Sequence, residues 1–140
     1  MRRYEALPSP GHVLPADACR ARKREFEVRV RFATEAGTLQ TPEGLVQVRP
    51  GDAIVTSRDG AQWRVSHVHF EAKYRPLGGE RFMSRVIEVR TERQLDAFEV
   101  QLSDGVSRLT GHAGDWLVDY GDGSLGVVSA AAFANSYDLI

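Results

Sequence analysis

The segment that decides the fold is PGDAIVTSRDGAQWRVSHVHFEAKY, residues 50–74, because a close copy of it returns near the end of the chain. The copy is AGDWLVDYGDGSLGVVSAAAFANSY, residues 113–137. Aligned without gaps, residues 51–74 and 114–137 are identical at nine of 24 positions. The shared residues are turn-forming glycines and aspartates, and large apolar side chains. Internal similarity of this kind indicates a repeated structural unit.

The similarity continues upstream with a slightly different offset. LQTPEGL (39–45) matches VQLSDGV (100–106), and REFEVRV (24–30) matches RVIEVRT (85–91). The repeats therefore span residues 24–74 and 85–137. Two copies are too few for a solenoid, and a unit of about 50 residues buries little surface alone. We therefore expect a pseudo-twofold pair that forms one core.

Each repeat is predicted to consist mainly of antiparallel strands. In EFEVRVRF (25–32), apolar and charged residues alternate, which is typical of a half-buried strand. TLQTPEGLVQV (38–48) predicts a hairpin around a Pro-Glu-Gly turn. AIVTS (53–57) and QWRV (62–65) predict a second hairpin, because an Asp-Gly turn joins them.

A short helical turn is predicted to close each repeat. Ser66 and Ser129 stand where a hydroxyl can cap such a helix, and Phe70 and Tyr74 lie four residues apart on one face. The predicted fold class is α+β, mostly antiparallel β: a pseudo-twofold pair of hairpin-rich repeats. The aromatic residues expected at or near the core are Trp63, Phe70, Tyr74, Trp116, Phe133 and Tyr137.

The remaining segments give weaker signals. Residues 1–23 hold three prolines and no hydrophobic period, so we expect an arm or linker with a small helix around residues 16–23. RFMSRVIEVR (81–90) predicts one strand, and residues 91–100 a helical turn before the next one. Residues 24–140 are expected to form a single domain.

The composition is that of a globular protein: 42% of the 140 residues are hydrophobic and 26% are charged. No apolar run approaches the length of a membrane helix, and the first residues are not a secretory signal. We therefore expect a cytoplasmic protein that does not bind membranes. The one cysteine, Cys19, excludes an intrachain disulfide. Basic neighbours leave two interpretations open for Cys19, a thiol of lowered pKa or an incidental one.

The formal net charge of −1 argues against sequence-specific nucleic-acid binding. The charge is nevertheless uneven. The last forty residues carry one arginine, Arg108, against five aspartates, so most of the positive charge lies earlier in the chain.

Several groups of residues have the side-chain types found in catalytic and metal sites. Asp52 and Asp59 recur as Asp115 and Asp122, but an aspartate beside a turn glycine usually binds its own backbone. His67 and His69 have no accompanying third metal ligand, so we expect no metal site. The chain has no phosphate-binding loop and no dinucleotide fingerprint, so we expect no cofactor.

One set of residues belongs to the first copy only. An aromatic side chain beside an arginine can stack on a base and hold a phosphate. The candidate ligand-binding residues are Trp63, Arg64, Arg49, Arg58, His67 and His69.

The repeated motifs resemble the PGDYG-type domain, and also small phage and prophage proteins with a TLEG…PGDWII…FE.TYE pattern. The resemblance covers most of residues 24–137, and the second copy departs from it at Ala113, Gly126 and Ala134. It implies a shared fold and a phage or bacterial setting, and it implies no defined chemistry. In the first copy the matching residues are Thr41, Glu43, Gly44, Pro50, Gly51, Asp52, Ile54, Val55, Asp59, Gly60, Trp63, Val65, Phe70, Glu71 and Tyr74.

Three functional hypotheses follow. The first is a non-enzymatic binding or interaction module that holds a protein partner or ligand near the cleft between the repeats, on the basic face of the first copy. The second is a nucleotide or small-anion binding protein, active in phage–host conflict. The third is a hydrolase that uses His67 or His69 with Asp52. The sequence leaves the oligomeric state open.

Overall fold

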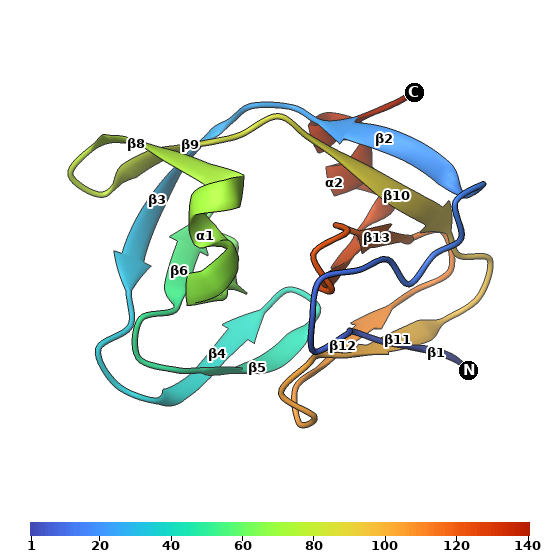
Figure 1. Cartoon of the computed structure of the whole chain (residues 1–140), viewed down its shortest axis with the longest axis horizontal. Coiled ribbons are helices and arrows are strands. Elements are labelled where there is room, and N and C mark those ends of the chain that lie inside the picture. The colour runs from blue at the N-terminus through green and yellow to red at the C-terminus, as the bar shows by residue number, and fades with distance from the viewer. The chain divides into compact units, whose positions relative to one another are not determined.

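The computed structural model describes all 140 residues and divides them into two compact units. Unit 1 comprises Met1–Lys23 and Ile87–Ile140, and unit 2 comprises Arg24–Val86. The chain therefore leaves unit 1 after its first 23 residues, builds unit 2 from one continuous segment, and returns (Figure 1). Each unit has its own five-stranded sheet and its own buried apolar residues.

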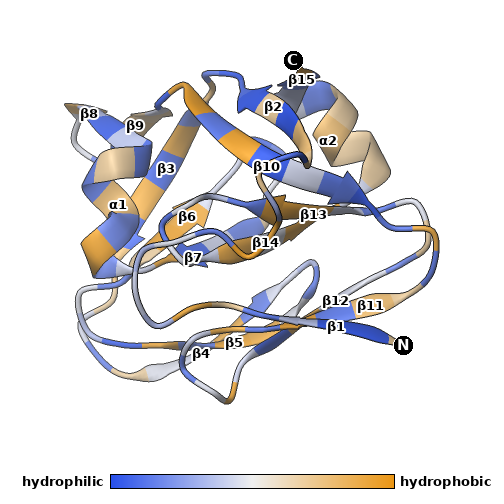
Figure 2. Ribbon diagram, turned by 45° about the vertical axis from the view of Figure 1, so that its right-hand side comes forward, coloured by the Kyte–Doolittle hydropathy of each residue, from blue (hydrophilic) through white to orange (hydrophobic).

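Unit 2 is built on an antiparallel sheet with the strand order β7-β6-β3-β9-β8. The central strand β3 buries Val28 and Val30 and exposes the arginines between them, and Figure 2 shows the alternation as bands of colour. The elements of this unit are β3 (Glu27–Phe32), β4 (Gly37–Thr41), β5 (Gly44–Val48), β6 (Ala53–Thr56), β7 (Gln62–Val65), α1 (His67–Lys73), β8 (Tyr74–Gly78) and β9 (Arg81–Ser84).

Helix α1 covers one face of that sheet. Phe70 points inward from the helix, and its ring stacks on Tyr74 with 5.3 Å between ring centroids. Both rings join a buried cluster with Val28, Val30 and other strand residues, so the predicted inward aromatic pair is confirmed. Trp63 is partly buried against the same cluster, and its Nε1–H donates to the Tyr74 hydroxyl at 3.3 Å.

Unit 1 contains a sheet with the order β14-β13-β10-β2-β15 and a smaller sheet with the order β1-β11-β12. Its helix, α2, lies beside β2, β10 and β13 in Figure 1. The elements are β1 (Arg2–Glu5), β2 (Cys19–Lys23), β10 (Ile87–Arg93), β11 (Phe98–Gln101), β12 (Arg108–Gly111), β13 (Trp116–Asp119), β14 (Leu125–Val128), α2 (Ala130–Ser136) and β15 (Tyr137–Leu139).

The five-stranded sheet of unit 1 is buried on both faces. Along β13, Val118 joins a cluster with Phe133 and Tyr137 below α2, whereas its neighbour Leu117 joins a second cluster with Phe98. A buried carboxylate secures the second face: Asp119 is fully buried and accepts the backbone N–H groups of residues 13 and 14 at 2.7 Å. The N-terminal segment is thereby held against the sheet.

The predicted short helix at residues 16–23 is wrong. Residues 19–23 instead form β2, which pairs with β10 on one side and β15 on the other. Ala21 is fully buried there between exposed arginines, and this sheet environment overrides the helix preference of alanine and arginine. Residues 1–23, expected to be an arm or linker, thus supply two strands to unit 1.

The fold class is confirmed at the level of a mostly antiparallel β protein with two short helices. Three details differ from the expectation. Residues 91–100 hold no helical turn, the strand predicted at residues 81–90 is split into β9 and β10, and a further strand follows each helix. Neither helix is long and apolar enough to cross a membrane.

Candidate functional site

The predicted tryptophan–arginine pair lies on opposite faces of the unit 2 sheet. Trp63 and Arg64 are neighbours in β7, and successive side chains of a strand point in opposite directions. Trp63 packs with the cluster below α1, whereas the Arg64 guanidinium donates to the Gln47 carbonyl at 2.6 Å. The two side chains therefore do not face one ligand.

The other predicted residues are also dispersed. His67 and His69 lie on α1, and a Cβ added to Gly51 would lie 3.7 Å from Nδ1 of His67. Arg49 is exposed just before the Pro-Gly-Asp turn, and Arg58 is exposed in the β6–β7 turn. The six predicted residues thus occupy both sides of the sheet, and the predicted site between the two copies stays a prediction.

The repeated carboxylates bind backbone. Asp52 is buried and accepts the backbone N–H groups of Arg49 at 2.9 Å and His67 at 3.3 Å. Asp115 does the same for His112 at 2.9 Å and Ala130 at 3.4 Å. His67 thus binds Asp52 through its backbone N–H, and its imidazole ring forms no hydrogen bond with Asp52.

The second pair of carboxylates, Asp59 and Asp122, fixes hairpin turns. Asp59 accepts the hydroxyl of Ser57 and the amide of Ala61, and these two hydrogen bonds lower the pKa of its carboxyl group. Asp122 accepts the backbone N–H of Ser124 at 2.8 Å. No group of three His, Cys, Asp or Glu side chains is arranged to hold a metal ion.

Several arginines do lie on the other face of the unit 2 sheet. Residues Glu27, Arg29 and Arg31 of β3 point away from the core, opposite Val28 and Val30. Strand register then aligns Arg29 with Arg81 of β9, and Ile54, the partner of Arg31, with Arg64. We call this surface the arginine face; it comprises Arg29, Arg31, Arg58, Arg64, Arg75 and Arg81.

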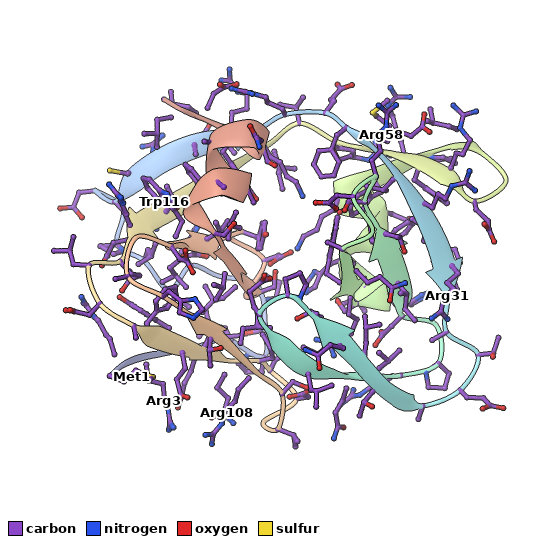
Figure 3. All side chains as sticks on the ribbon, turned by 180° about the vertical axis from the view of Figure 1, so that it is seen from behind. Met1, Arg3, Arg31, Arg58, Arg108 and Trp116 are labelled. Atoms are coloured by element: carbon purple, nitrogen blue, oxygen red, sulfur yellow. The ribbon has the colours of Figure 1, made fainter.

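Most of the arginine face is open to solvent. All its members except the half-buried Arg64 are exposed, and Figure 3 labels Arg31 and Arg58 among the side chains of this unit. The Arg31 side chain makes no hydrogen bond or ion pair. Arg75 reaches only one carboxylate oxygen, of Glu25, at 3.8 Å.

The positive charge of this surface affects the ionisation of Glu27. The Arg81 guanidinium donates to both Glu27 oxygens, at 2.9 and 3.2 Å. The hydrogen bond from Arg81, followed by the charges of Arg81, Arg58 and Arg29, lowers the pKa of Glu27 below its usual value. Glu27 thus lies among several guanidinium groups, and excess positive charge remains.

A comparison with known protein families identifies the family of this chain. The family model described as PGDYG protein matches residues 44–138, which is more than half of the chain. The chain belongs to the PGDYG family. The resemblance to the PGDYG-type domain is thereby confirmed. No curated protein and no solved structure shows a significant match to the chain.

The sequence hypothesis missed four arginines of this PGDYG family member, Arg29, Arg31, Arg75 and Arg81. The sequence did indicate two of these arginines, because Arg29 and Arg31 alternate with buried valines in a predicted strand. The other two lie outside any predicted hairpin with β3, and only the pairing of β9 with β3 and β8 places them on the same face.

Proposed function

We propose that this PGDYG protein is a cytoplasmic, non-enzymatic interaction module of a phage or bacterial system, and that its arginine face binds an acidic protein partner. The arginine face itself carries the proposal. Six guanidinium groups gather on one sheet face with few carboxylates between them, and Arg31 has no partner in its own chain. Guanidinium groups pair with carboxylates through two parallel hydrogen bonds, as Arg81 already does with Glu27.

An acidic protein fits this surface better than a nucleic acid. The aromatic residues Trp63, Phe70 and Phe82 belong to the opposite, helix-covered side of the sheet, so none stands among the arginines to stack on a base. Unit 2 carries ten basic and eight acidic residues, a net charge of +2, whereas unit 1 carries eight and eleven, a net charge of −3. The positive charge is therefore concentrated in unit 2.

The hydrolase and nucleotide hypotheses find less support. The hydrolase requires a histidine ring beside Asp52, whose two oxygens accept backbone amides. The nucleotide site requires Trp63 and Arg64 on one side of β7, and they point to opposite sides.

We also propose that the two units derive from one duplicated segment. Their five-stranded sheets support this, because β3, β6, β7 and β8 have counterparts at the same places in β10, β13, β14 and β15. The remaining position, the fourth in each sheet, is filled by β9 in unit 2 and by β2 in unit 1, and each of these strands comes just before the start of a repeat in the chain. If each repeat is extended to include the strand that precedes it, each would have given that strand to the sheet of the other, and a pseudo-twofold pair is the expected product.

The interaction proposal is tested with poly-L-glutamate as a model of an acidic protein surface, measured by calorimetry at low salt. The double variant Arg29→Glu/Arg31→Glu should weaken binding about tenfold or more, because each lost charge-assisted hydrogen bond is worth about 1.5–3 kcal/mol. Added salt should weaken binding of the unchanged protein, since exposed charges are screened.

The matched control is Arg20→Glu/Arg22→Glu, which reverses the same number of exposed charges on β2 of unit 1. It should leave the affinity nearly unchanged. Equal losses in the two double variants would show a dependence on net charge alone and overturn the proposal. A single-stranded DNA of equal charge that binds more tightly than poly-L-glutamate, with loss in the Arg29/Arg31 variant, would reassign the arginine face to nucleic acid.

A further inference from the structure

A row of stacked aromatic rings borders a hollow in unit 1. Trp116 stacks on Phe133 with 4.0 Å between centroids, and Phe133 stacks on Tyr137 at 4.8 Å, all three rings nearly parallel. The hollow has a volume of about 380 Å³, within the range of small-molecule sites. Figure 3 labels Trp116, which lies beside α2. The lining residues are Arg93, Trp116, Ala130, Phe133, Ala134, Tyr137, Asp138 and Leu139.

Two small side chains keep the hollow open on the helix side. Ala130 and Ala134 lie one helical turn apart on α2, and both line the hollow. The first and fifth residues of α1 in unit 2 are instead His67 and Glu71, whose side chains are much larger. The hollow thus depends on alanines at two particular helix positions.

The strand residue that borders the hollow in unit 1 also differs from its counterpart in unit 2. The last residue of β3 in unit 2 is Phe32, whose ring meets Phe70 edge-on at 5.2 Å and thus covers that ring. The last residue of β10 in unit 1 is Arg93, which faces Trp116 across the strand pair. A covering aromatic ring is thus absent in unit 1, and a cation stands at the rim.

Arg93 is available to a ligand. Its side chain is exposed, and it makes no hydrogen bond or ion pair within the chain. A free guanidinium beside an aromatic surface favours a ligand with a flat ring and an anionic group, because the two parts are recognised by stacking and by a charge-assisted hydrogen bond. Asp138 lines the same hollow, and its charge disfavours a ligand with more than one negative charge.

We propose that this hollow binds a small planar aromatic molecule that carries one carboxylate group. The ring lies against Trp116, and the carboxylate pairs with Arg93. The site lies entirely in unit 1 and does not depend on the arginine face of unit 2.

The probe is naphthalene-2-carboxylate, with its neutral amide, naphthalene-2-carboxamide, as the comparison. Binding is followed by NMR through the indole N–H signals, because the chain has only two tryptophans. The Trp116 signal should shift on titration, while that of Trp63 in unit 2 serves as the internal reference. The amide should bind about tenfold more weakly, since it lacks the charge-assisted hydrogen bond.

Three variants separate specific binding from general hydrophobic adsorption. Arg93→Gln should weaken the carboxylate about tenfold and leave the amide unchanged. Ala134→Phe should fill the hollow and remove binding of both compounds, and its exposed helix position keeps the fold intact. The control Arg20→Gln, an exposed arginine of β2, should change neither affinity.

The proposal is overturned if Trp116 does not shift, if both tryptophans shift with the same apparent affinity, or if Arg93→Gln binds the carboxylate as tightly as the unchanged protein does. It is also overturned if adenosine monophosphate, which has a flat ring and a doubly charged phosphate, binds at the same signal more tightly than the carboxylate.

Discussion

Two serines at the same position before the two helices are expected to differ in their contribution to stability. Ser129 precedes α2, and its hydroxyl accepts the backbone N–H of Ala132 at 3.2 Å. Ser66 precedes α1 with nearly the same backbone angles, yet its side chain caps nothing, and its Oγ is buried without a hydrogen-bond partner. The predicted capping role is therefore found in one helix and not in the other.

The perturbation is a serine-to-alanine substitution at each site. Ser129→Ala removes a cap and should lower the free energy of unfolding by about 1 kcal/mol. Ser66→Ala removes a buried hydroxyl that makes no hydrogen bond, so it should leave stability unchanged or raise it by up to about 1 kcal/mol. The two variants should therefore differ by roughly 1–2 kcal/mol.

The assay is urea denaturation followed by tryptophan fluorescence. Because Trp63 lies in unit 2 and Trp116 in unit 1, each serine is measured in the background that keeps the tryptophan of its own unit and replaces the other with phenylalanine. The midpoint should move while the dependence on urea stays constant, as for a change in stability alone.

Ser103→Ala is the control, because this exposed serine has no hydrogen-bond partner. It should change the free energy of unfolding by less than about 0.5 kcal/mol. The reasoning is refuted if Ser66→Ala destabilises unit 2 as much as Ser129→Ala destabilises unit 1, since the Ser66 hydroxyl would then be bonded in solution.

Three further predictions concern packing, a buried charge and the division of the chain. Gly111→Ala should cost about 1–3 kcal/mol in urea denaturation, because its Cβ would lie 2.2 Å from the Phe98 ring, whereas Gly37→Ala has free space and should be neutral; equal effects would contradict this. Asp119→Ala should cost roughly 3 kcal/mol and speed hydrogen exchange at Val13 and Leu14, while exposed Asp96→Ala should do neither; unchanged exchange would show that another contact holds the segment. Replacing residues 24–86 by an Asn-Gly turn should leave unit 1 folded by NMR, because Lys23 and Ile87 are opposite each other in the β2–β10 pair; an unfolded product would show that unit 1 needs unit 2.

Local pattern accounts for the correctly predicted elements. The alternation of charged residues and valines predicted β3, and the Asp-Gly turn predicted the β6–β7 hairpin. The serines marked where both helices begin. These features depend on residues near one another in the chain, so the sequence contains their full signal.

The candidate site was predicted less well for two different reasons. The separation of Trp63 from Arg64 was already implied by the predicted strand at residues 62–65, because neighbours in a strand face opposite sides. The sequence indicated the hollow in unit 1 only weakly. Where the first repeat has Ala53 and Phe32, the second repeat has Trp116 and Arg93. Only the strand register shows that those two exchanges meet at one place.

The sequence by itself determined the periodic strands, the turns, the helix starts and the family, because each is encoded by the order of nearby residues. The tertiary structure alone decided that β2 and β9 fill the same place in different sheets, and that the arginines of β3 and β9 lie on one face. The physical reason is that strand pairing satisfies backbone hydrogen bonds between segments far apart in the chain, and a short segment such as residues 19–23 carries little local preference for one partner over another.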